Sequence, residues 1–312
     1  MKPLISIVTP CYNEEAGIGE CYQAVRRLFE ARLPEYDHEH IFIDNCSTDK
    51  TVAILKEIAT RDGQVKIIVN ARNFGAQRSP YYAMLQARGD LVIPVLADLQ
   101  TPPAIIPEML ARWREGFKVV IAVHRTSREG ILISNIRRLF YALIKRISNV
   151  EQISNFFGYG LYDRQFIEAM RPLYDPEPYF RGLVAEIGFA RAIVEYDQPI
   201  RKHGRSRHSL SDLIDLAFVA LSTYSKAPMR LMTMTGGVVA LLSALGGCVY
   251  FVLKLVYWSS IPIGITPMLL ATLFLGAIQL LALGLVGEYV ALLLAYARRF
   301  PIVIEKERVN FD

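Results

Sequence analysis

Five short runs of apolar residues recur in the first part of the chain and are rich in Ile and Val. They lie at residues 4–9, 41–43, 66–69, 91–95 and 118–123. Continuous apolar runs of this length predict strands that are buried on both faces, as in a parallel sheet. Stretches with helical spacing alternate with them, at residues 17–31, 51–60 and 80–87. The alternation predicts a doubly wound, Rossmann-like α/β fold with a mostly parallel sheet and a ligand at the carboxyl ends of its strands.

The last third of the chain contains two long stretches without charge. No charged residue occurs in residues 231–253 or 255–287, and each stretch exceeds the roughly 20 residues that cross a bilayer. Lys226 and Arg230 precede the first stretch, whereas the connection offers only Lys254. The second stretch is followed by Arg298, Arg299, Lys306 and Arg308. The positive-inside rule therefore predicts a transmembrane hairpin with both ends in the cytoplasm.

Two shorter segments, residues 137–149 and 210–224, place apolar side chains on one helical face and basic side chains elsewhere. Such helices either pack on a folded domain or lie flat on a bilayer. The second segment lies just before the first uncharged stretch, which favours a position flat on the bilayer for this segment. The predicted organisation is an α/β domain at 1–208, a juxtamembrane amphipathic helix at 209–228, two transmembrane helices within 229–297 (about 231–253 and 267–296) and a cytoplasmic tail at 298–312.

Composition supports a membrane segment. Hydrophobic residues make up 52% and charged residues 21% of the chain, with a mean hydropathy of +0.26. The excess of hydrophobic residues over a soluble protein is concentrated in part of the chain. The net charge of +5 is spread along the chain, which favours a membrane surface or a phosphorylated substrate over nucleic acid. Four cysteines without CxxC spacing argue against a disulfide framework or a zinc site. The N-terminus lacks a signal-peptide pattern, so we expect a cytoplasmic first domain.

Polar segments follow the first four predicted strands. They are PCYNEE at 10–15, DNCSTD at 44–49, RNFG at 72–75 and ADLQ at 97–100. A nucleotide needs such a rim, with an aromatic or Pro wall, a carboxylate for the base or ribose, and a divalent cation for the diphosphate. Asp44 suits the base or ribose, and Asp98 suits the cation. A helix cap is the alternative for each Asp, and it is the better one for Asp49.

With these segments the sequence resembles the family-2 glycosyltransferases of GT-A fold. It is most similar to the polyprenyl-phosphate branch, which includes dolichyl-phosphate mannose synthases and bactoprenol glucosyltransferases. The resemblance covers nearly the whole chain. Besides the four segments it is carried by ARGD at 87–90, TPP at 101–103, FRGL at 180–183, RKHGRSR at 201–207 and GEY at 287–289.

The resemblance implies an inverting transfer of a sugar from a nucleotide-diphosphate sugar to a polyprenyl phosphate, undecaprenyl or dolichyl, at the cytoplasmic face of the plasma membrane, for a cell-envelope glycan. It implies a divalent cation, Mg²⁺ or Mn²⁺, on Asp98, and Asp98 and Arg125 as catalytic residues. The implied nucleotide-sugar contacts are Pro10, Tyr12, Glu14, Asp44, Asn73, Ala97, Asp98 and Gln100. The implied phosphate or acceptor contacts are Arg125, Arg201, Ser206 and Arg207.

Binding of lipid headgroups is an alternative role for Arg201 and Arg207. Glycines in the first uncharged stretch would let helices pack between subunits, so a homo-oligomer stays open. These glycines are Gly236, Gly237, Gly246 and Gly247.

Three positions depart from the family's pattern. Leu96 replaces the first Asp of an Asp-Ala-Asp motif, and Asn45 follows Asp44 where a second Asp is common. Gly158 stands at an acidic position, in a segment that we expect to be a loop near the sugar or the acceptor phosphate. An altered donor sugar or a reduced activity would explain these changes.

Two other functions stay open from the sequence. One is transfer to a different membrane acceptor, such as a diacylglycerol or a polysaccharide. A processive synthase is disfavoured, because it needs more spans and a Gln-x-x-Arg-Trp signature that this chain lacks. The other is a nucleotide-sugar-binding membrane subunit with weakened catalysis, which Leu96 and Gly158 favour and Asp98, Asp44 and Arg125 oppose.

Overall fold

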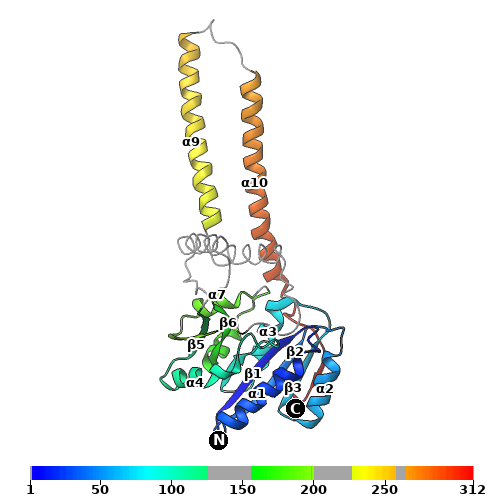
Figure 1. The fold of residues 1–312 in the computed structure, drawn as a ribbon. Coiled ribbons are helices and arrows are strands. Elements are labelled where there is room, and N and C mark those ends of the chain that lie inside the picture. Colours follow the sequence, from blue (N-terminus) through cyan, green and yellow to red (C-terminus); the bar gives the residue numbers. More distant parts are fainter. Residues whose placement is uncertain are drawn as a thin grey trace. The chain divides into compact units, whose positions relative to one another are not determined.

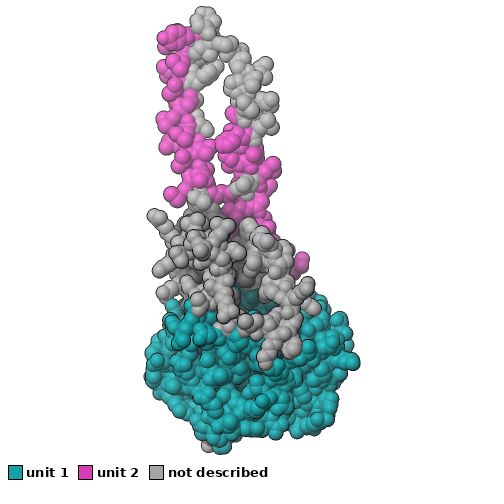
Figure 2. All heavy atoms as spheres, viewed as in Figure 1, with its two compact units in different colours: residues 1–146, 150–219, 299–312 teal, residues 147–149, 220–298 magenta. Residues whose placement is uncertain are grey.

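The structure is a computed structural model in which the chain separates into two compact units (Figure 2). The described residues are 2–125, 156–176, 178–197, 199, 227–257 and 265–311, and every statement below concerns these residues. Unit 1 comprises residues 1–146, 150–219 and 299–312, and unit 2 comprises residues 147–149 and 220–298. The predicted amphipathic segments at 137–149 and 210–224 lie outside the described residues.

Unit 1 is built on a sheet whose described strands run in the order β7-β5-β6-β4-β1-β2-β3-β8 (Figure 1). The strands are β1 (Leu4–Cys11), β2 (Asp37–Asp44), β3 (Val65–Asn70), β4 (Leu91–Pro94), β5 (Val119–His124), β6 (Phe156–Asp163), β7 (Arg191–Tyr196) and β8 (Glu305–Val309). Strand β1 pairs in parallel with β2 and β4, β2 with β3, and β5 with β7. The predicted α/β class with a mostly parallel sheet is therefore confirmed.

Helices cover both faces of this sheet. They are α1 (Ile18–Arg32), α2 (Thr51–Arg61), α3 (Gly75–Gln86), the 3₁₀ turn η1 (Pro103–Ile105), α4 (Ile106–Arg114), α6 (Arg164–Met170) and α7 (Phe180–Glu186). Helices α1 and α4 pack on one face, where Ile5 and Ile7 of β1 are fully buried. Helices α3, α6 and α7 pack on the other face, against Val8 of the same strand. The alternation of side chains along β1 thus supplies both cores, as a doubly wound sheet requires.

Residues 157–160 are not the loop that the sequence suggested. They lie inside β6, which pairs antiparallel with β4 and β5 in the interior of the sheet. Two glycines in a short segment are typical of a loop, but in this strand they permit close packing. A Cβ at Gly160 would overlap the carbonyl oxygen of Val120, and Gly158 has a φ of 88° and faces the Phe180 ring, which a Cβ would meet at 3.3 Å.

The last residues of the chain form a strand that the sequence did not predict. Strand β8 pairs antiparallel with β3 at the edge of the sheet, and Figure 1 shows the C-terminus beside β3 and α2. Val303, just before this strand, is 4% exposed, and the Asn310 side chain donates to the carbonyl oxygens of Ala59 (3.0 Å) and Val65 (2.9 Å). The segment predicted to be a tail is therefore part of unit 1.

Unit 2 holds two long helices, α9 (Ala227–Val256) and α10 (Ile265–Arg298). The predicted long apolar segments are thus helical. Within the described residues, only the stretch Phe274–Arg298 has the length and hydropathy of a membrane span, with a mean hydropathy of 2.0 and no burial. One such helix is weak evidence for a membrane protein, so the predicted two-helix transmembrane hairpin stays a prediction.

Candidate functional site

The carboxyl ends of β1, β2, β3 and β4 meet at one edge of the sheet. The register sets Cys11 opposite Asp44, Asp44 opposite Val69, and Val8 opposite Pro94. The polar segments singled out from the sequence continue from these ends, so all four gather at this edge. We refer to this edge, formed by residues 10–15, 44–51, 71–75 and 95–101, as the rim. A crevice at the carboxyl ends of parallel strands is where open α/β sheets bind ligands.

The loops after β1 and β2 are joined by hydrogen bonds between backbone and side chains. The Asn13 amide donates to Ser47 Oγ (2.8 Å), and the Thr48 amide donates to Asn13 Oδ1 (2.8 Å). The Glu14 amide donates to Thr51 Oγ1 at 2.9 Å, which docks the first loop on the start of α2. These bonds fix the two loops as one rigid element of the rim.

Asp49 serves the start of α2, as the capping interpretation predicted. Its Oδ1 accepts from the Thr51 amide (3.0 Å) and the Thr51 hydroxyl (2.6 Å), and its Oδ2 accepts from the Glu15 amide (3.1 Å). Burial alone would raise the pKa of Asp49, but the hydrogen bonds from Thr51 and Glu15 outweigh burial and hold it below its usual value. A charged carboxylate at this position also favours the helix N-terminus.

Asp44 lies at the end of β2 and is fully buried. One carboxylate oxygen accepts from the Ser47 amide at 2.8 Å, and the other accepts from the Ser47 hydroxyl. Burial raises the pKa of Asp44, and the hydrogen bonds from Ser47 oppose that effect. Both oxygens thus act within the turn at residues 44–47. Because Asp44 is fully buried, a contact from it to a base or ribose, as predicted from the sequence, would require the turn at residues 44–47 to open.

Asn45 follows Asp44 and is 7% exposed. Its Oδ1 accepts from Asn70 Nδ2 (3.0 Å) and the Phe74 amide (2.9 Å). Its Nδ2 donates to Asn73 Oδ1 (2.8 Å) and to the Gly75 carbonyl (3.2 Å). The side chain therefore connects the end of β2 to the loop after β3.

Asp98 lies in a tight turn after β4, on the same edge. Its Oδ1 accepts from the Gln100 amide at 3.1 Å, and Leu99 between them has a φ of 58°. The Leu96 amide donates to Thr101 Oγ1 at 2.7 Å, which closes the base of the turn. Asp98 is half-buried, whereas Leu96 exposes 40% of its surface.

Strained backbone marks the same edge. Among the described residues, five that are not glycine have a positive φ, and three of them lie on the rim: Asn13 at 54°, Cys46 at 66° and Leu99 at 58°. Each follows a different strand. A left-handed conformation costs a residue such as Leu on the order of 1–3 kcal/mol, and residues of this kind gather at functional sites. The strain therefore points to this edge as the site, independently of the sequence motifs.

The other implied nucleotide contacts are distributed along the rim. Pro10, Tyr12 and Glu14 are half-buried, and Ala97 is 5% exposed. Asn73 is exposed, and its Oδ1 also accepts from the Gly75 amide at 2.8 Å. The structure thus brings together every implied nucleotide-sugar residue. Arg201, Ser206 and Arg207 lie outside the described residues.

Arg125 follows β5, next to the parallel strand β7. Its Nε is 3.2 Å from Glu195 Oε2, and its Nη1 is 3.9 Å from Asp197 Oδ2. All three side chains are mostly exposed, so this ion pair is worth little in free energy. A phosphate can therefore compete for the guanidinium at small cost.

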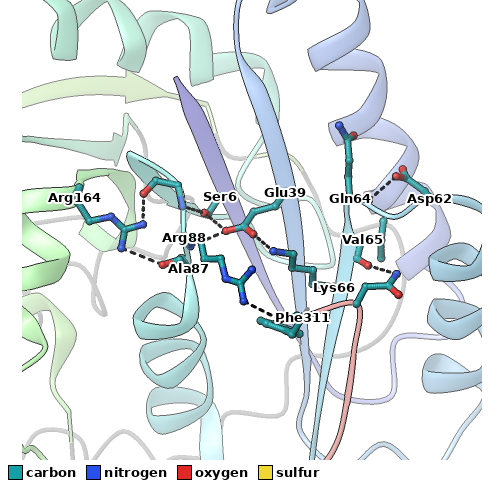
Figure 3. Close-up of polar contacts among 12 residues, drawn as sticks. Ser6, Glu39, Asp62, Gln64, Val65, Lys66, Ala87, Arg88, Arg164 and Phe311 are labelled. Atoms are coloured by element: carbon teal, nitrogen blue, oxygen red, sulfur yellow. Dashed lines mark hydrogen bonds and ion pairs between the residues drawn. The ribbon is translucent and has the colours of Figure 1, made fainter. Parts of the chain in front are cut away.

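A second polar network lies at the opposite, amino-terminal ends of the strands (Figure 3). Glu39, 3% exposed, accepts from Ser6 Oγ (2.5 Å), Lys66 Nζ (2.5 Å) and the Arg88 amide (2.8 Å). Arg88 Nη2 donates to the Phe311 carbonyl oxygen at 2.7 Å. Burial alone would raise the pKa of Glu39, but the hydrogen bonds from Lys66, Ser6 and Arg88 hold it below its usual value. The ARGD segment therefore joins the sheet to the C-terminus and is not part of the rim.

The implied cation can be tested against the rim residues. Within the described residues no group of three or more His, Cys, Asp or Glu side chains could hold a metal ion. Mg²⁺ at nucleotide sites is usually held by one or two carboxylates together with substrate phosphates, and not by a cage of protein ligands. Asp98, half-buried in a fixed turn, fits that single-carboxylate mode.

Comparisons with known proteins decide the family. Residues 6–171 match the family described as Glycosyl transferase family 2. "Uncharacterized glycosyltransferase YkcC" of Bacillus subtilis (strain 168) is 34% identical over 312 residues, covering 98% of this chain and 94% of that protein. "Bactoprenol glucosyl transferase" of Shigella phage SfV is 31% identical over 303 residues, covering 97% of this chain and 98% of that protein. The chain belongs to glycosyltransferase family 2.

This glycosyltransferase also has a partial likeness to a solved structure. The crystal structure of glucosyl-3-phosphoglycerate synthase from Mycobacterium tuberculosis in complex with Mn²⁺, uridine-diphosphate and phosphoglyceric acid is 19% identical to it. The match covers 71% of this chain and 77% of that chain, with a TM-score of 0.47.

Sequence reasoning missed the residues that organise the rim of the glycosyltransferase. Ser47 and Asn13 link the loops after β1 and β2, and Asn45 links β2 to the loop after β3. The residue types alone indicated turns, because Asn and Ser are common in turns and form hydrogen bonds with nearby backbone groups. The partners of Asn13 and Asn45 in other segments lie 25 to 35 residues away in sequence, so only the fold reveals them.

Proposed function

We propose that this glycosyltransferase transfers a sugar from a nucleotide-diphosphate sugar to a polyprenyl phosphate, with inversion at the anomeric carbon, at the cytoplasmic face of the plasma membrane. The observation that carries the proposal is the rim, where four strand ends meet. Asp98 lies in the turn after β4, and hydrogen bonds of Asp44, Ser47 and Asn45 hold the neighbouring loops in place. The name of the phage relative, bactoprenol glucosyl transferase, supports a polyprenyl acceptor.

The proposed step needs little proton chemistry. A phosphate oxygen of the acceptor attacks the anomeric carbon, and the bond from that carbon to the diphosphate breaks, so the nucleoside diphosphate leaves with the electron pair. The acceptor phosphate is already anionic near neutral pH, so a strong general base is not required. The protein must position two anionic partners and neutralise the leaving group.

Asp98 and Arg125 are the residues proposed for that task. A divalent cation held by Asp98 and the donor diphosphate would stabilise the charge that develops on the leaving group. Arg125 would bind the acceptor phosphate after releasing Glu195 and Asp197. Gln100 fixes the orientation of the Asp98 carboxylate through its amide.

The course of the chain supports a membrane-anchored enzyme with two crossings. Strand β8 follows α10 directly and belongs to the same sheet as β1 to β3. Both ends of the chain therefore lie on one side of any membrane, and the segment between them must cross it an even number of times. Because α10 has 34 residues, or about 50 Å of helix, and α9 has 30, these two are the proposed spans.

A membrane assay tests the proposed function. Membranes that contain the full chain would receive polyprenyl phosphate, Mg²⁺ or Mn²⁺ and one of a panel of labelled nucleotide sugars, and the organic phase would be counted. Label in a lipid that mild acid cleaves supports the proposal. Label in an acid-stable lipid indicates another membrane acceptor, and no label from any donor indicates a nucleotide-sugar-binding subunit.

Asp98→Ala should reduce transfer at least 100-fold, because one electrostatic contact to a developing charge is worth that much. Asp62→Ala is a matched control, since Asp62 Oδ1 accepts from the Gln64 amide (2.9 Å) in the same geometry, away from the rim. Asp62→Ala should keep the wild-type rate. Equal activity in the two variants would refute the role of Asp98.

A further inference from the structure

The loop after β3 is held against the end of β2 mainly by one side chain. Asn45 makes four hydrogen bonds, and three of their partners belong to consecutive residues, Asn73, Phe74 and Gly75. The fourth partner, Asn70, is fully buried at the end of β3 and also donates to Ser79 Oγ at 3.0 Å.

The contacts at position 45 in this chain match the two donors and two acceptor sites of a carboxamide. The oxygen of Asn45 faces two N–H donors, and its nitrogen faces two oxygen acceptors. A carboxylate would satisfy the two donors but would set a negative charge against the Asn73 and Gly75 oxygens. An aliphatic side chain would leave all four groups without this partner, two of them on the buried residues Asn70 and Phe74.

The loop held in this way forms one part of the rim. The Phe74 side chain is 6% exposed, and the Arg72 guanidinium stacks on its ring at 4.1 Å from the centroid. On its other side the loop is bounded by the chain that enters β8, since the Ala71 amide donates to the Ile304 carbonyl oxygen at 2.9 Å. Asn45 is the main contact that joins this loop to the turn at residues 44–47, and a weaker bond runs from Cys46 Sγ to the Ala71 carbonyl oxygen at 3.9 Å.

We propose that Asn45 is a positioning residue of the donor site, which fixes the loop Arg72–Gly75 against the end of β2 so that the rim is preformed for a nucleoside diphosphate. The inference rests on the proposed function. All four hydrogen-bonding positions of Asn45 are used within the protein, so its effect on the nucleotide passes through the loop.

Equilibrium binding of UDP and GDP to the full chain in nanodiscs tests the inference, with Mn²⁺ present. Asn45→Asp should raise the Kd of the nucleotide that binds wild type by about tenfold or more, because the loop loses its preformed position. Asn310→Asp is the matched control. Asn310 likewise donates two hydrogen bonds through its Nδ2, here to the backbone carbonyl oxygens of Ala59 and Val65, at the amino-terminal side of the sheet. Its variant should bind with the wild-type Kd, even if it melts at a lower temperature.

Hydrogen exchange supplies a readout that needs no ligand. Asn45→Ala should accelerate exchange of the Phe74 and Gly75 amides relative to the amides of β1, whereas Asn310→Asp should not. If Asn45→Asp or Asn45→Ala does not fold, Asn45→Ser takes its place in the corresponding measurement.

Equal Kd values for Asn45→Asp and Asn310→Asp, or unchanged exchange at residues 74 and 75, would overturn the positioning role. Absence of nucleotide binding to the wild-type chain would instead refute the proposed function, so the two failures are distinguishable.

Discussion

Leu96 is the residue on the rim whose replacement is most informative. It exposes 40% of its surface two residues before Asp98, at the position where the family resemblance leads us to expect a second Asp. Leu96→Asp should lower the Mn²⁺ concentration for half-maximal transfer about tenfold, because a second carboxylate would share the cation with Asp98. The measurement is the rate of sugar transfer as a function of metal concentration.

Leu173→Asp is the control for that variant, since Leu173 is equally exposed, at 40%, and lies outside the rim. It adds the same charge to unit 1 and should leave the metal dependence unchanged. A metal dependence of Leu96→Asp that matches the wild type would show that position 96 does not face the cation.

His40 should make stability depend on pH. It is 2% exposed, its ring stacks on Phe42, and its Nε2 lies 2.9 Å from Thr9 Oγ1. Burial lowers the pKa of His40 to about 3. Between about pH 3 and 6.5 the unfolded chain binds a proton at this residue and the folded chain does not. The free energy of unfolding should therefore fall as pH falls from 6.5, by about 1.4 kcal/mol per pH unit.

The test of this prediction is His40→Gln, which keeps a polar partner for Thr9 but does not titrate. Thermal unfolding of both proteins between pH 7 and 5 should show a smaller slope for the variant. Glu39 and Asp49, whose pKa values are lowered, add their own losses only below that window. Identical slopes for the two proteins would contradict the assignment to His40.

At the residue scale, the sequence predicted where the candidate side chains lie in the fold better than what they contact. The positions of Asp44, Asn73 and Asp98 at strand ends followed from the apolar runs that precede them. The use of both Asp44 oxygens by Ser47 did not follow, because it depends on the turn between them. The role of Asn45 was missed for a similar reason, since its partners arrive with another strand.

Among the elements, β8 gives the clearest prediction. Val303 and Ile304 are neighbours in the segment that enters this strand, but Val303 is 4% exposed and Ile304 is 42% exposed. Val303→Asp should destabilise unit 1 by on the order of 3 kcal/mol or more, because it buries an unpaired charge, whereas Ile304→Asp should cost less than about 0.5 kcal/mol. Melting of the purified chain measures both. Equal melting temperatures would mean that the segment does not pack on unit 1 in solution.

The elements that the sequence revealed share one physical property. Each of the strands β1 to β5 contains a buried apolar run rich in Ile or Val, and this run marks the strand in the sequence. Strand β6 was missed because its glycines, required for close packing against Val120 and Phe180, resemble a loop. Strand β8, with the sequence EKERV, was missed because it is an exposed edge strand whose charges discourage further pairing.

For the whole molecule, the proposed even number of membrane crossings makes a prediction about sidedness. A reporter that is active only in the cytoplasm should be active when fused after residue 312, and one that is active only outside should be active when inserted within residues 258–264. The reason is that β8 and β1 belong to one sheet, so the residues after α10 must lie on the same side of the membrane as β1. An outside location for a fusion at residue 312 would contradict both the proposed spans and the cytoplasmic site.

The position of β8 also governs how the protein is made. Lys56 and Glu307, which form an ion pair of 2.7 Å at this edge, are 251 residues apart. At about 5–20 residues per second, the ribosome needs roughly 12–50 s to deliver the partner of β3 after β3 itself has emerged. During that interval the edge of β3 is open to pairing with other chains. A chain that ends before β8 would keep this edge open, so it should aggregate more readily than the full chain.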